Sequence, residues 1–109
     1  MTYNLPLSTI IKPQPDGTWV ATSLEFGLEE SGASVEEAYD ELCKLISAIA
    51  TTFVETDDLE CIFYNQSDSS IFRDFAQGVQ AEGLKPFSFK LGELELPNME
   101  VRIWHPYNG

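Results

Sequence analysis

The chain has 109 residues, enough for one domain with a core of its own, and its 43% apolar and 12% aromatic residues exclude intrinsic disorder despite a net charge of −12. No apolar run is long enough to cross a bilayer, and the N-terminus lacks the basic and then apolar segments of a signal peptide. We therefore expect residues 1–109 to form a single cytoplasmic domain that does not contact membranes.

The first part of the chain predicts three strands. A strand is expected over 2–12, where strand-forming residues are frequent and Pro6 implies an edge position or a bulge. The prolines and the Asp-Gly pair within 13–17 then turn the chain. Alternating residues predict a second strand over 19–24, antiparallel to the first, and a short third strand follows over 28–31. Together these segments form an antiparallel β-β-β meander.

Residues 34–54 predict one long amphipathic helix. Ser34 can cap this helix, and Glu37 three residues later completes a capping box, in which each side chain accepts a hydrogen bond from an otherwise unpaired amide. The helix is about 30 Å long, so we expect it to lie across the sheet. The apolar residues that recur on one helical face are Val35, Ala38, Leu42, Leu45, Ile46, Ile49 and Phe53.

After residue 54 the pattern predicts a strand, a helix and two strands, which makes the chain an α+β protein. Gly83 is expected to end the second helix, because glycine readily adopts the conformation of a helix C-terminus. The expected elements are a strand over 59–64, a helix from Ser69 or Ser70 to about Glu82, and strands over 86–91 and 99–104 around a connection at 92–98.

The charge is concentrated in one part of the chain. Between residues 25 and 60, eleven acidic residues are opposed by a single cation, Lys44. Such a surface repels phosphate backbones, so we expect no direct binding of nucleic acid through it, and it attracts basic partners. A surface that only keeps the protein soluble is the alternative interpretation.

Several short motifs in the first half resemble the N-terminal domain of the HicB-like antitoxins. That family tends to show a D/N-G turn, an aromatic-V-A strand and a helix start of the form G-x-(S/T)-x-E-E-A. The resemblance covers about residues 3–54 and leaves about 59–109 unmatched. The matching residues are Asp16-Gly17, Trp19-Val20-Ala21, Gly27 and the run from Ser31 to Ala38.

The resemblance implies a partial ribonuclease-H-like fold, with a mixed β-β-β-α core followed by another strand and helix. It also implies a non-catalytic module that binds a small basic RNA-cleaving toxin, HicA-like, and covers its active site. Family members often carry a C-terminal DNA-binding module, and residues 59–109 show none. The acids that we expect to meet a basic partner are Glu29, Glu30, Glu36, Glu37, Asp40 and Glu41.

The sequence predicts no catalytic, cofactor-binding or metal-binding residues. A two-metal nuclease of the ribonuclease-H type would resemble its relatives in carrying a carboxylate on the first strand, and residues 3–12 contain none. Asp57, Asp58 and Glu60 lack the glycine-bearing spacing of an EF-hand, so we interpret them as a solvated helix end. The single histidine, His105, is expected to pack against the sheet or a second subunit.

A function of another class stays open. The chain can be an orphan HicB-like domain without a toxin partner, which self-associates or binds a small ligand between helix and sheet. Residues 99–104 carry few charges for an edge strand, and such an edge can pair with its copy in a homodimer.

Overall fold

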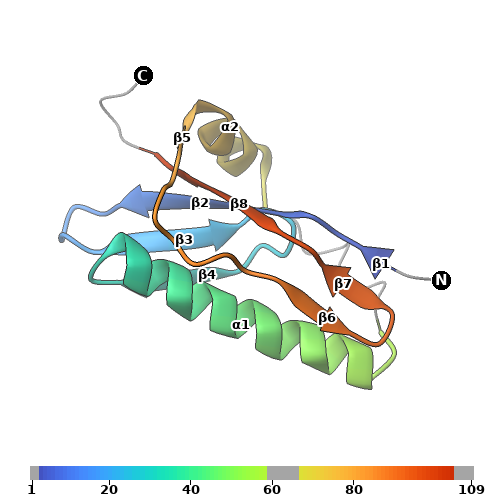
Figure 1. The fold of residues 1–109 in the computed structure, drawn as a ribbon. Coiled ribbons are helices and arrows are strands. Elements are labelled where there is room, and N and C mark those ends of the chain that lie inside the picture. The colour runs from blue at the N-terminus through green and yellow to red at the C-terminus, as the bar shows by residue number, and fades with distance from the viewer. Residues whose placement is uncertain (1–2, 59–66, 105–109) are drawn as a thin grey trace.

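The computed structural model describes residues 3–58 and 67–104, which form an α+β domain with two helices and two mixed sheets (Figure 1). The α+β class expected from the sequence is confirmed. The strands are β1 Tyr3–Asn4, β2 Leu7–Pro13, β3 Trp19–Ser23, β4 Glu29–Gly32, β5 Val79–Gln80, β6 Phe89–Leu91, β7 Leu94–Leu96 and β8 Met99–Ile103. The helices are α1 Val35–Glu55 and α2 Ser69–Gln77.

The larger sheet has the order β4-β3-β2-β8-β5. Its first three strands are the expected antiparallel meander, with Thr9 opposite Ser23 between β2 and β3. The last long strand, β8, lies parallel to β2, with Thr9 opposite Val101. A parallel neighbour requires a crossover, and the chain between β4 and β8, which includes α1, supplies it.

The first expected strand is divided between the two sheets. Residues 3–4 form β1, which pairs in parallel with β7 in the smaller sheet of order β1-β7-β6. Residues 7–13 form β2, which lies between β3 and β8, so the edge position inferred from Pro6 is wrong for β2. Pro6 instead lies in the break between the two strands, where its missing N–H costs no ladder hydrogen bond.

Helix α1 begins and is capped as the sequence predicts. The Ser34 Oγ accepts a hydrogen bond from the Glu37 N–H at 3.1 Å. The Glu37 carboxylate accepts from the Ala33 N–H at 3.1 Å, one residue before the position that the usual capping box would use. Both bonds pair amides that would otherwise lack a partner at the start of the helix.

One side of the larger sheet is covered by α1, and α2 lies on the opposite side (Figure 1). The helix comes very close to β4, because a Cβ on Gly32 would lie 2.4 Å from the Ala38 nitrogen. Toward its C-terminal half α1 also contacts β6 of the smaller sheet. The core residues on this side are Leu7, Ile11, Ala21, Phe26, Ala38, Tyr39, Leu42, Ile46, Ala50, Leu94, Leu96 and Val101.

Helix α2 is shorter than expected at its C-terminal end. Asp68, and not Ser69 or Ser70, is its N-cap, because the Asp68 carboxylate accepts from the Ser70 N–H at 3.0 Å. The helix ends at Gln77 and Gly83 does not terminate it. Gly78 follows at a point where an added Cβ would lie 3.0 Å from the Arg102 Cβ, so the chain turns against β8 there.

The C-terminal part contains a hairpin that the sequence pattern did not predict. The expected strand over 86–91 is reduced to β6, and the expected connection at 92–98 contains β7, which pairs with β6 around Gly92. The expected edge strand at 99–104 is β8, and it lies between β2 and β5. The expected homodimer required this strand to lie at a free edge of the sheet. Because β8 has a neighbour on each side, the structure does not offer that edge for pairing with a second copy. The expected strand at 59–64 and His105 lie outside the described residues.

Candidate interaction surface

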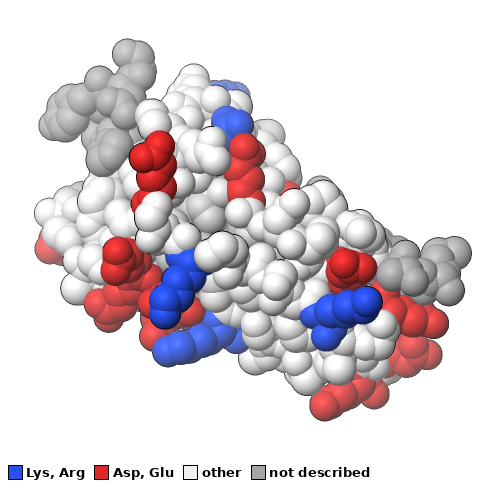
Figure 2. Space-filling model, in the orientation of Figure 1, with Lys and Arg blue, Asp and Glu red and all other residues white. Residues whose placement is uncertain are grey.

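The six acids expected to meet a partner come from two elements that lie next to each other. Glu29 and Glu30 belong to β4, where successive side chains point to opposite faces of the sheet. The other four lie in the first two turns of α1, which packs against β4. In the view of Figure 2, acidic side chains gather at both ends of α1, and basic side chains lie among them. The six acids therefore share a region, but not a single plane.

Two of these acids already have partners within the chain. The Glu37 carboxylate caps the start of α1 through the Ala33 N–H. The Glu41 side chain is 45% exposed and forms an ion pair with Lys44 at 3.3 Å. An exposed pair of this kind contributes little to stability, since solvent screens it. Glu41 can exchange Lys44 for another cation at small cost, whereas Glu37 would lose part of its cap.

Glu36 and Asp40 are exposed and line a shallow polar hollow of about 210 Å³ with the segment Gly83 to Lys85. Tyr39 also lines this hollow, and its hydroxyl donates a hydrogen bond to the carbonyl oxygen of Lys85. Burial raises the pKa of Tyr39, so its hydroxyl stays protonated and keeps donating. Within residues 3–58 and 67–104, no cation lies within ion-pair distance of Glu36 or Asp40.

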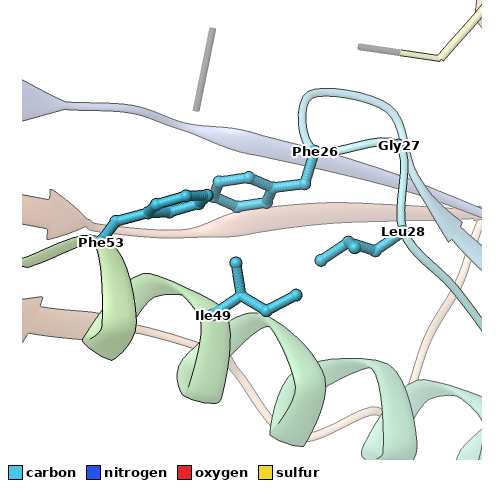
Figure 3. A pocket seen from close by; sticks show the side chains of 5 residues that line it. All are labelled: Phe26, Gly27, Leu28, Ile49 and Phe53. Atoms are coloured by element: carbon cyan, nitrogen blue, oxygen red, sulfur yellow. The ribbon is translucent and has the colours of Figure 1, made fainter. Parts of the chain in front are cut away.

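A larger cavity of about 360 Å³, lined by apolar side chains and by main-chain atoms, lies between the C-terminal half of α1 and the turn that joins β3 to β4 (Figure 3). Phe26 is 3% exposed, and its ring points toward the ring of Phe53. Leu28, Ile49 and Phe53 are half-buried around the cavity. Gly27 adopts a positive φ of 67° in the turn above. The sequence places Ile49 and Phe53 on the apolar stripe of the helix, and the structure leaves both partly exposed beside this turn.

Glu25 holds the turn that borders this cavity. Its carboxylate accepts a hydrogen bond from the Ser8 N–H of β2 at 2.7 Å, and the Leu24 N–H donates to the Ser8 carbonyl at 2.9 Å. Burial raises the pKa of Glu25, although the bond from Ser8 opposes the shift. The sequence pattern did not predict this hydrogen bond of Glu25. The signal in the sequence is a glutamate placed between two large apolar residues, Leu24 and Phe26.

The described residues include a free cysteine, Cys43, on α1. Burial raises the pKa of the Cys43 thiol to about 11, so it is protonated and weakly nucleophilic at neutral pH. No group of three or more potential metal ligands occurs in residues 3–58 and 67–104. The described surface also carries exposed carboxylates and a cavity lined by apolar side chains.

No protein-family model, curated protein or solved structure matches this chain. Neither α1 nor α2 combines the length and apolarity that a membrane-crossing helix requires.

Proposed function

We propose that this chain is a non-catalytic, acidic protein-binding module of the HicB-like kind. It neutralises a small basic RNA-cleaving toxin, HicA-like, by covering the toxin's active site. The observation that carries the proposal is the pair of exposed carboxylates of Glu36 and Asp40 at the start of α1, which have no ion-pair partner among residues 3–58 and 67–104. The neighbouring strand β4 carries two further acids, Glu29 and Glu30. Carboxylates in this arrangement can occupy positions where a ribonuclease holds RNA phosphates.

The topology supports the resemblance on which the proposal draws. The segment β2-β3-β4-α1 has the β-β-β-α order that the resemblance implies, and β8 provides a further strand beside β2. The larger sheet is mixed, since β8 is parallel to β2 and β3 is antiparallel to it. We take this order as favouring a partial ribonuclease-H-like fold, with α2, β5, β6 and β7 inserted before the strand that completes it.

The proposal is tested by isothermal titration of the whole chain against the small basic ribonucleases encoded beside it. We expect binding at low salt, and we expect the double variant Glu36→Gln/Asp40→Asn to weaken it by tenfold or more, roughly the effect of two charge-assisted contacts. The matched control is Glu82→Gln/Glu93→Gln, which removes the same charge from exposed positions elsewhere. Absence of binding to every candidate, or equal losses in both variants, would refute the proposal.

A second candidate function is an orphan domain that binds a small apolar ligand between helix and sheet. The cavity beside Phe26 favours it, because 360 Å³ lies within the range of small-molecule sites, about 300–1,000 Å³. A toxin-like reading frame directly beside the gene supports the first function, and its absence supports the second.

A further inference from the structure

Strand β4 forms one edge of the larger sheet, and half of its residues direct their main-chain groups away from that sheet. The Ser23 N–H donates to the Leu28 carbonyl at 2.8 Å, and this hydrogen-bonded pair continues the register of β3 with β4. Such pairs recur at every second residue of an antiparallel ladder. In β4, the residues whose main chain faces outward are therefore Glu29 and Ser31.

This edge is open in the described part of the chain. Glu29 and Ser31 are both exposed, and no strand within residues 3–58 and 67–104 pairs with the outer side of β4. With four residues, β4 is longer than the other edge strands of the two sheets, which are β1, β5 and β6. Each outward residue can exchange two main-chain hydrogen bonds with a residue of an added antiparallel strand.

Helix α1 holds β4 in place for such pairing. The helix packs against this strand, and a Cβ on the buried Gly32 would lie only 2.4 Å from the Ala38 nitrogen. The chain then passes through the Ser34 cap directly into α1. Because the strand is already fixed in an extended conformation, an added strand does not have to order it, which lowers the entropy cost of association.

The charge along this part of the chain has one sign. Residues 13–43, which contain β3, β4 and the first turns of α1, include eight acids and no lysine or arginine. Lys12, directly before this stretch, is already paired with Asp74. Lys44, directly after it, is already paired with Glu41. The surroundings of β4 therefore attract a positively charged strand.

The charges of β4 also decide against a second copy of the same strand. Glu29 and Glu30 point to opposite faces of the sheet, because successive side chains of a strand alternate. A second copy of β4 would bring two more glutamates to this edge, and like charges opposite each other across strands are destabilising. A strand with lysine or arginine on both faces forms favourable cross-strand pairs instead. The edge thus discriminates against self-pairing and in favour of a basic strand.

We propose that the outer edge of β4 pairs with an extended strand of a basic partner protein, through the main chain of Glu29 and Ser31. Lysines or arginines of that strand lie opposite Glu29 and Glu30 on the two faces of the sheet. The inference rests on the proposed function and deepens it, since it names the element by which the basic partner is held.

Two peptides test the edge without knowledge of the natural partner. Each is a fluorescein-labelled hexapeptide in which two valines are each followed by two lysines, so that neighbouring lysines point to opposite faces of an extended strand. Every main-chain amide is N-methylated in the second peptide, which keeps the charge but loses the hydrogen-bond donors. We expect the unmethylated peptide to bind the whole chain roughly tenfold or more tightly in fluorescence polarisation at low salt. Equal affinity of the two peptides, or no binding of either at millimolar concentration, overturns the inference.

Two proline variants on the two edges of the larger sheet locate the pairing. Ser31→Pro removes an outward N–H that bonds to no neighbouring strand, so we expect the variant to fold and to lose the preference for the unmethylated peptide. Gln80→Pro is the matched control on β5, where the bond from the Ala81 N–H to the Val101 carbonyl places the Gln80 main chain outward too. A preference that survives in Ser31→Pro, or that is lost equally in Gln80→Pro, contradicts the inference.

If Ser31→Pro unfolds, as thermal unfolding will show, amide hydrogen exchange of the unaltered protein replaces it. In the free chain, the amides of Glu29 and Ser31 should exchange faster than the amide of Glu30, which bonds to β3. The unmethylated peptide at saturation should slow exchange at the two outward amides, and the methylated peptide should not. Unchanged exchange at Glu29 and Ser31 would refute the pairing.

Failure of this inference and failure of the proposed function give different results. If a neighbouring basic ribonuclease binds Ser31→Pro as tightly as the unaltered chain, while Glu36→Gln/Asp40→Asn weakens it, the edge pairing is refuted and the function stands. If the unmethylated peptide pairs with β4 but no neighbouring ribonuclease binds the chain, the edge pairing is supported and the antitoxin function is refuted.

Discussion

At the scale of single residues, Glu25 is a partly buried carboxylate that connects a turn to a neighbouring strand. Its carboxylate is partly withdrawn from water and accepts a hydrogen bond from the Ser8 N–H of a neighbouring strand. It thereby joins the β3–β4 turn, which borders the cavity beside Phe26, to the centre of the sheet. The position of this turn depends on one charged hydrogen bond as well as on the burial of Leu24 and Phe26.

The raised pKa of Glu25 makes the contribution of this residue to stability depend on pH. Because burial raises its pKa in the folded state above the ordinary value of 4.5, the folded protein binds this proton more tightly than the unfolded chain. The contribution therefore favours folding at low pH and declines as pH rises from the unfolded pKa through the folded one.

We expect Glu25→Gln, which keeps an acceptor for the Ser8 N–H, to gain stability relative to the unaltered protein as pH rises through this window. Urea unfolding at about pH 4 and pH 7 measures the change. Glu29→Gln is the control, because it removes the same charge from an exposed neighbouring position and reports general charge repulsion. A gain no larger in Glu25→Gln than in Glu29→Gln would contradict the expectation.

At the scale of elements, the two helices are attached to the sheet by different forces. Helix α1 buries Ala38, Tyr39, Leu42, Ile46 and Ala50, whereas α2 buries no residue fully. Helix α2 is held instead by charged groups of the sheet. Lys12 of β2 forms an ion pair with Asp74, and the Arg102 guanidinium of β8 lies 4.4 Å from the Phe75 ring centroid and donates to the Phe75 carbonyl at 3.0 Å.

We expect Asp74→Asn to loosen α2 without loosening α1. Loss of this partly buried pair should cost about 1 kcal/mol, which corresponds to roughly fivefold faster amide hydrogen exchange in α2. Exchange in α1 should not change, because apolar burial holds that helix. Glu41→Gln is the matched control, since its pair with Lys44 is exposed. Equal exchange of α2 in Asp74→Asn and the unaltered protein would show that Lys12 and Asp74 do not hold the helix.

At the scale of the whole molecule, the excess of acids opposes compactness. The chain carries 18 acidic residues against 6 lysines and arginines. Folding brings these like charges closer together than they are in the unfolded chain, so their mutual repulsion destabilises the folded state. This repulsion is screened by salt, since the Debye length falls from about 30 Å at 0.01 M to about 8 Å at physiological ionic strength.

We therefore expect the midpoint of global thermal unfolding to rise when sodium chloride is increased from about 0.01 M to about 0.15 M. Scanning calorimetry measures the midpoint, and sucrose at equal osmolality controls for solvent effects that do not involve charge. A midpoint that falls with salt would show that specific ion pairs such as Lys12 with Asp74 outweigh the general repulsion.

The amino-acid sequence by itself determined the features that depend on neighbouring residues. Ser34, Glu37 and the apolar stripe predict α1 to within one residue at each end, because capping and helical periodicity act over a few positions. The meander of β2, β3 and β4 follows likewise from alternation and turn residues. The concentration of acids between residues 25 and 60 is also visible in the sequence alone.

Only the tertiary structure decided which distant segments meet. The sequence pattern does not show that Thr9 pairs with Val101, or that residues 3–13 are divided between two sheets. It also does not show the two-residue strands β1 and β5, because such short strands form only when a distant partner is in place. The bond from Ser8 to Glu25 and the cavity beside Phe26 depend on these pairings too. The helical spacing of apolar residues predicts that Phe53 faces the sheet. Whether a cavity remains beside Phe53 depends on the path of the β3–β4 turn, which the spacing does not contain.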